Sequence, residues 1–199
     1  MHPNQPALRR VACGIVWLCL LTAPQQAASR TEAASPGAWP ERVYRWYYNP
    51  QHAPLWLSAE SARALVEEAS KPWLACGVRM AYQGEISRAP GKMDQLNVVG
   101  WSLKIPPQLR GMTTGRAQQG QLRERDIVIR ADRAEFERSP QLLQKVITHE
   151  FGHAIGLTHS ARCDDVMTLA ADCPETDPDR LPLVLTAHDL ARCLAIYPP

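Results

Sequence analysis

The chain has 199 residues, including 22 Lys or Arg, 20 Asp or Glu and 6 cysteines. This length is enough for one domain with a hydrophobic core of its own. Removing the first 29 residues takes away two arginines and no acidic residue, which leaves 20 basic and 20 acidic residues. Such a balance excludes the strongly basic surface that attracts nucleic acids or anionic membranes.

The beginning of the chain is typical of a secretion signal. Two arginines precede an apolar run of 12 residues, which is too short to span a bilayer, and small residues suited to cleavage gather around Ala28. We therefore expect a signal peptide over residues 1–29, a flexible lead-in over residues 30–40 and the folded domain over residues 41–199. The mature protein would be secreted, periplasmic or extracellular, and would have no integral membrane segment.

Runs of apolar and β-favouring residues predict four strands. These strands are expected over residues 43–48, 78–86, 96–101 and 125–130. The last one contains the sequence Ile-Val-Ile, a continuous apolar run that is typical of a strand inside a sheet. Residues 104–123 show little periodicity, so we expect a loop there, with one short edge strand at Met112 to Gly115.

Capping signals predict three helices. Ser58 can cap a helix that runs to about residue 70, where a proline follows shortly. Ser139 followed by a proline is a strong helix start. Near the end of the chain, Thr186 and Asp189 form a variant of the capping box before an apolar helical face.

Four cysteines remain after the expected signal peptide. They are Cys76, Cys163, Cys173 and Cys193. An even number of cysteines in an exported chain favours two disulfides, and four cysteines allow three pairings. We prefer Cys163 with Cys173, which closes a short loop, and Cys76 with Cys193, which ties an early helix to the last one.

Three histidines after Ser139 have the spacing of a zinc site. His149 and His153 are four residues apart, so on a helix they project from the same face. Gly156 can end this helix in a sharp turn, which lets His159 swing back as the third ligand. Three histidines leave the fourth position of zinc for water, as in catalytic rather than closed structural sites.

Glu150 stands directly after the first of these histidines and can reach the water on zinc. We therefore predict that Glu150 is the general base of a hydrolytic reaction. The alternative is a buried helix with incidental histidines. That alternative leaves the match of five positions within eleven residues unexplained.

The segment His-Glu-Phe-Gly-His-Ala-Ile-Gly-Leu-Thr-His-Ser resembles the HExxHxxGxxHS signature of the metzincin metallopeptidases. The serine after the third histidine, Ser160, is similar to the pattern of the matrixin branch. The resemblance implies a methionine turn, and Met167 stands eight residues after His159, at a spacing similar to that of the matrixins. There it would form an apolar floor beneath the ligands. Leu169 occupies the position at which astacin- and serralysin-type relatives carry a tyrosine, which disfavours those branches.

The resemblance implies an α+β, metzincin-like zinc peptidase fold over residues 41–199. In this fold a mixed, twisted sheet packs on an N-terminal helix and an active-site helix, and a C-terminal helix follows the Met-turn. The implied protein is a secreted zinc endopeptidase, expected to be a monomer, that cleaves protein or peptide substrates. A zinc-bound water would attack the peptide bond with Glu150 as general base, and the substrate would lie along the edge strand at Met112 to Gly115.

Two other functions remain open at this point. One is a zinc-containing protein-binding module with weak or no catalytic activity, which the intact Glu150 disfavours. The other is hydrolysis of a different amide or ester, for which the same ligands would serve.

The sequence departs from the matrixin pattern in two respects. No cysteine lies between the expected leader and the first strand, so latency through a prodomain cysteine is not supported. No histidine lies between Trp101 and His149, so we do not expect the second, structural zinc. His52 and His188 are the other histidines of the expected mature chain, and we expect them to be surface or capping residues.

Calcium is conceivable from several aspartates but is not supported by their order. They lack the alternation of a dedicated calcium loop and are better explained as solvated charges. These residues are Asp94, Asp126, Asp132, Asp164 and Asp165.

Overall fold

The computed structural model describes residues 32–169, 173 and 183–199. The expected signal peptide lies outside the described residues. Five strands form one mixed sheet with the order β2-β1-β3-β5-β4. The strands are β1 (Val43–Asn49), β2 (Arg79–Glu85), β3 (Val98–Ser102), β4 (Gly111–Gln118) and β5 (Gln121–Arg130).

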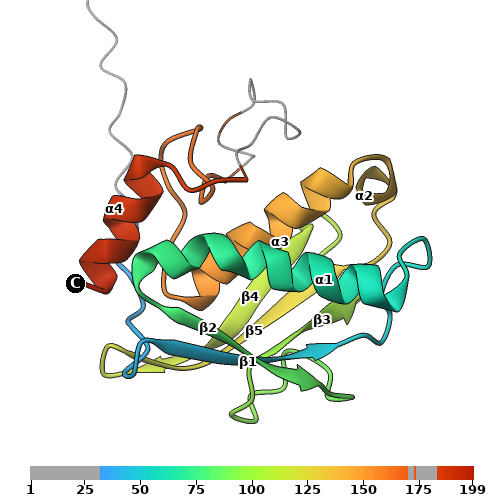
Figure 1. Ribbon diagram of the computed structural model, residues 1–199, viewed down its shortest axis with the longest axis horizontal. Coiled ribbons are helices and arrows are strands. Elements are labelled where there is room, and N and C mark those ends of the chain that lie inside the picture. The colour runs from blue at the N-terminus through green and yellow to red at the C-terminus, as the bar shows by residue number, and fades with distance from the viewer. Residues whose placement is uncertain (1–31, 170–172, 174–182) are drawn as a thin grey trace, which may run out of the picture.

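The first four strands in this order run parallel, and β4 pairs antiparallel with β5 at the edge of the sheet. The helices are α1 (Ala59–Ser70), the 3-10 helix η1 (Lys71–Cys76), α2 (Ala134–Arg138), α3 (Pro140–Ala154) and α4 (Ala187–Ile196). Figure 1 shows α1 and α3 side by side on one face of the sheet, with α4 at the end of this layer. The α+β fold class is therefore confirmed.

The core lies between the sheet and the two long helices. Ile127 and Ile129 of β5 are fully buried on the face toward the helices, and Val128 is buried on the other face. This confirms the expectation that β5 runs inside the sheet. Trp46 of β1 stacks edge-on against Phe151 of α3, with their ring centroids 5.3 Å apart.

The edge strand β4 is longer than the sequence indicated. It extends beyond Met112 to Gly115 and joins β5 through a tight hairpin turn at Gln119 and Gly120. Both turn residues have positive φ, 50° and 71°, as a two-residue hairpin requires. Glutamine is an uncommon first residue for such a turn, so the sequence carried only a weak signal for the hairpin. The short helix α2 also had no clear signal.

The segment expected to be a flexible lead-in is ordered where the structure describes it. Residues 32–40 run along the end of α3, and Trp39 is buried in the core, where its Nε1 donates to the carbonyl oxygen of Ala154 at 2.9 Å. Ala38 forms a β-bridge with Gln121 at the start of β5. The boundary expected at residue 41 is therefore too late, because a large aromatic side chain anchors a segment that is otherwise small and polar.

Both disulfides have the pairing preferred from the sequence. Cys76 at the end of η1 bonds to Cys193 of α4, 117 residues away, and Cys163 bonds to Cys173, 10 residues away. The first bond fastens the C-terminal helix to the helical layer. Of the helices that the structure describes, none combines the length and the apolar character needed to cross a membrane.

Candidate metal and catalytic site

Helix α3 positions the first two histidines and Glu150. The Ser139 hydroxyl caps its first turn by accepting the N–H of Leu142 at 3.3 Å, as predicted. The helix ends just before Gly156, which has a φ of 101°. A Cβ at this position would lie 2.3 Å from the carbonyl oxygen of Gly37, so the turn needs glycine for both its conformation and its packing.

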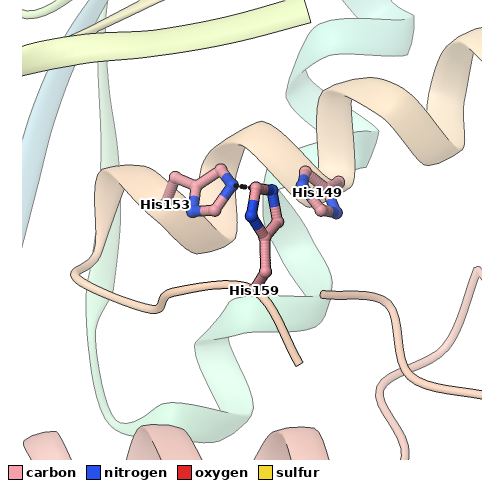
Figure 2. Close-up of side chains that lie close together, drawn as sticks. All are labelled: His149, His153 and His159. Carbon is pink, nitrogen blue, oxygen red and sulfur yellow. Dashed lines mark hydrogen bonds between the residues drawn. The ribbon is translucent and has the colours of Figure 1, made fainter. Parts of the chain in front are cut away.

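The turn brings the third histidine back over the helix. Figure 2 shows His159 reaching from its loop toward the side chains of His149 and His153 on α3. One ring nitrogen from each histidine lies within 4.8 Å of the others. The Nε2 atoms of His153 and His159 are 3.2 Å apart. Within the described part of the chain, this is the one group of at least three His, Cys, Asp or Glu side chains that could hold a metal ion.

Backbone carbonyls fix the orientation of the two helical imidazoles. His149 Nδ1 lies 2.8 Å from the carbonyl oxygen of Val166, and His153 Nδ1 lies 2.7 Å from that of Leu157. Because a carbonyl oxygen only accepts, each Nδ1 carries the proton, and each Nε2 keeps a lone pair for a metal. Contacts of this kind are typical of histidines that bind metals.

The arrangement fits zinc. Two nitrogens bound to a tetrahedral zinc at about 2.0–2.1 Å are about 3.3 Å apart. The observed separation of 3.2 Å between the Nε2 atoms of His153 and His159 is close to this value. Burial lowers the pKa of His149 to about 4 and lowers the pKa of His153 well below its usual value, with further lowering by neighbouring histidines. Both rings are therefore held neutral, as metal ligands must be.

Glu150 is buried beside the histidines, with 5% of its surface exposed. Its carboxyl group lies against β4, where the Thr113 hydroxyl is 2.7 Å from Oε2 and 3.0 Å from the Glu150 carbonyl oxygen. Burial raises the pKa of Glu150 to about 7, although the hydrogen bonds with Thr113 act in the opposite direction. A carboxyl group in this environment can both take and return a proton near neutral pH.

Met167 lies beneath this part of α3. It is fully buried, and a Cβ placed on Gly152 would lie 2.2 Å from its sulfur. The Met167 carbonyl oxygen accepts the N–H of Ser160 at 2.8 Å, which ties the turn to the loop that carries His159. The contact with Gly152 places the buried Met167 side chain against α3.

Asp189 holds the same turn from α4. As predicted, it completes a capping box with Thr186, and its buried carboxylate also accepts the N–H groups of Val166 at 2.8 Å and Met167 at 3.3 Å. The peptide unit between Val166 and Met167 therefore links Asp189 to His149. Its N–H group donates to Asp189, and its carbonyl oxygen contacts His149 Nδ1. The capping pattern was visible in the sequence, but this second role was not.

Two of the aspartates expected to be solvated charges are buried instead. Asp126 accepts the N–H groups of Gly91, Lys92 and Val98, and so holds the loop before β3 on the sheet face away from the helices. Asp165 accepts hydrogen bonds from the hydroxyls of Ser160 and Thr186 and from His188 Nδ1. The interpretation as solvated charges is wrong for both, because loop N–H and hydroxyl groups that need acceptors cannot be located from the sequence.

The remaining candidate aspartates and histidines do not belong to the three-histidine cluster. Asp132 and Asp164 have side chains that are about half exposed or more, and Asp94 pairs with Arg88. His52 is exposed, and His188 donates from Nδ1 to Asp165. The sequence did not indicate that Thr113 contacts Glu150 or that Gly152 contacts Met167. Only Gly152 had a signal, because it lies inside the histidine motif.

Comparisons with known proteins agree with this geometry. A family model described as matrixin matches residues 119–197. The crystal structure of archaemetzincin from Methanopyrus kandleri has the same fold, with a TM-score of 0.52 and 14% identity over 80% of this chain and 98% of that chain. None of the curated proteins compared matches the sequence. Residues 119–197 are therefore similar to the matrixins, and the chain has a metzincin-like fold.

Proposed function

We propose that this chain is a secreted zinc endopeptidase in which His149, His153 and His159 hold one zinc ion and Glu150 is the general base. The observation that carries the proposal is the convergence of the three imidazoles, with the Nε2 atoms of His153 and His159 only 3.2 Å apart. Glu150, which follows His149 on the same helix, has a buried side chain. The expected signal peptide and the two disulfides support export to an oxidising compartment.

A bound zinc ion would act as a Lewis acid on the scissile carbonyl and would lower the pKa of the attacking water. Glu150 would remove a proton from that water and later deliver it to the leaving amine. Its burial against β4 suits this task, because the low polarity there keeps the protonated and ionised forms close in free energy. No covalent bond between the protein and the substrate is needed.

The edge strand β4 is the proposed docking site for the substrate. It pairs with β5 on one side, and its other side has no strand partner among the described residues. An extended peptide could therefore add to the sheet through main-chain hydrogen bonds. β4 also contacts Glu150 through Thr113, so a peptide placed there would lie next to the proposed base.

Substitutions that separate metal binding from catalysis test the proposal. Glu150→Gln should retain zinc and lose most turnover, whereas His153→Ala should lose the metal. Glu137→Gln on exposed α2 and His52→Asn in an exposed loop are the matched controls. Zinc content is measured by elemental analysis, and turnover is measured on a peptide library with and without a chelator.

Undiminished cleavage by Glu150→Gln would exclude the proposed base. A protein that binds zinc but shows no chelator-sensitive cleavage would support the binding-module alternative. Cleavage of small amides or esters without cleavage of peptides would instead indicate a different hydrolase.

A further inference from the structure

Thr113 lies on β4 with its side chain facing α3. It pairs with Ile127 of β5, whose side chain is in the core on the same face of the sheet. Its Oγ1 is 2.7 Å from Glu150 Oε2 and 3.0 Å from the Glu150 carbonyl oxygen. The same strand that would bind the substrate therefore contacts the proposed general base.

We propose that Thr113 is a positioning residue that holds the Glu150 carboxyl group for proton transfer, an inference that rests on the proposed function. A hydroxyl group has one proton and two lone pairs, so it can donate one hydrogen bond and still accept others. Thr113 has two acceptors of Glu150 within reach. The hydroxyl therefore contacts both the side chain and the backbone of Glu150.

The Thr113 hydroxyl lies within hydrogen-bond distance of both Oε2 and the backbone carbonyl oxygen of the same glutamate. It therefore contacts the Glu150 carboxyl group and the α3 backbone from which that side chain extends.

Gly111 confines the carboxyl group from the same strand. A Cβ on Gly111 would lie 2.9 Å from both Cγ and Oε1 of Glu150 and 3.0 Å from Cγ1 of Val146. The backbone of β4 thus approaches the carboxyl group at one point, and the Thr113 hydroxyl contacts it two residues further along. The Gly111 backbone and the Thr113 hydroxyl therefore contact the Glu150 carboxyl group from the same strand.

Three variants of the zinc-loaded protein test this role. Thr113→Val keeps the shape and the strand preference of threonine but removes the hydroxyl, and Thr113→Ser keeps the hydroxyl. Glu137→Gln is the matched control, since Glu137 is exposed on α2 and lies outside β4. Zinc content and unfolding temperature are measured for each variant, together with kcat and KM on a cleaved peptide.

We expect kcat of Thr113→Val to fall roughly 10- to 100-fold, as for the loss of a hydrogen bond to a charged group. KM should change less than about twofold, since Thr113 faces α3 and not the peptide. Thr113→Ser and Glu137→Gln should keep kcat near that of the unchanged protein. Unchanged kcat in Thr113→Val, or an equal loss in Thr113→Ser, would overturn the inference.

A double variant shows whether Thr113 acts through Glu150. In the Glu150→Gln background, adding Thr113→Val should cause little further loss of residual turnover. A full further loss would contradict the inference. A crystal structure of Thr113→Val gives a readout independent of turnover, and a Glu150 carboxyl group still in place against β4 would also contradict it. If the unchanged protein cleaves no peptide, the proposed function itself fails, and the inference fails with it.

Discussion

Gly152 and Met167 meet so closely that no side chain fits at position 152. A Cβ there would lie 2.2 Å from the Met167 sulfur and 2.6 Å from Cζ2 of Trp73. Glycine inside a helix costs about 1 kcal/mol relative to alanine. Helix α3 thus has a weaker local preference at this point, and the close contact with the methionine turn beneath the histidines depends on it.

The substitution Gly152→Ala should destabilise the protein despite the gain in helix propensity. Overlap with two buried side chains costs typically about 1–3 kcal/mol, which exceeds the gain of about 1 kcal/mol. The displaced Met167 should also weaken zinc binding. Denaturant unfolding and zinc titration check both effects, with Gln141→Ala on the exposed face of α3 as the control. A Gly152→Ala protein more stable than the unchanged one would show that Met167 and Trp73 move aside easily.

The two disulfides should differ in their contribution to stability. They close loops with sequence separations of 117 residues, for Cys76–Cys193, and 10 residues, for Cys163–Cys173. Loop entropy then gives about 4.9 and about 2.7 kcal/mol, respectively. Replacing each pair by alanines and measuring denaturant unfolding tests this order. A larger loss from the short loop would mean that native packing around Cys173, and not chain entropy, sets the effect.

Asp165 should make the protein sensitive to acid. Burial alone would raise the pKa of Asp165, but the hydrogen bonds from Ser160, Thr186 and His188 lower it on balance. A carboxyl group with a lowered pKa in the folded state stabilises the protein above the unfolded pKa of about 3.9 and loses this contribution as the pH falls through the folded value. Asp165→Asn should therefore reduce the free energy of unfolding at pH 7 by about 1–3 kcal/mol.

The difference between Asp165→Asn and the unchanged protein should shrink as the pH falls below about 4. Denaturant unfolding measured across this range shows the effect. Asp164→Asn is the control, because its side chain is 64% exposed and pairs with Arg162 at the surface. A difference that stays constant down to the lowest pH would show that Asp165 contributes by packing alone.

The predictable parts of the molecule are those that depend on neighbours in the sequence. The cap at Ser139 and the capping box of Thr186 and Asp189 involve residues three positions apart, so their patterns can be read directly. The metal-binding motif is local in the same sense, since a helix and one turn bring His149, His153 and His159 together.

The unpredicted parts depend on contacts between distant segments. Thr113 and Glu150 are 37 residues apart and meet because β4 pairs with β5 beneath α3. The sequence of β4 is polar and contains glycines, and nothing in it distinguishes Thr113 from the adjacent Thr114 as a contact of Glu150. Likewise, Asp126 resembles a surface charge until the fold brings to it two N–H groups of the loop before β3 and one at the start of β3.

The ordered segment before β1 affects how the protein should be produced. The Ser35 hydroxyl donates to the Gly156 carbonyl oxygen at 2.8 Å, the Thr158 hydroxyl donates to the Ala33 carbonyl oxygen at 2.8 Å, and Glu32 pairs with Arg192 at 2.6 Å. A recombinant chain that starts at the first strand would lack every one of these contacts with the loop before His159 and with α4. Expression should therefore begin upstream of Glu32, and purification tags belong behind a linker that leaves this segment free to dock.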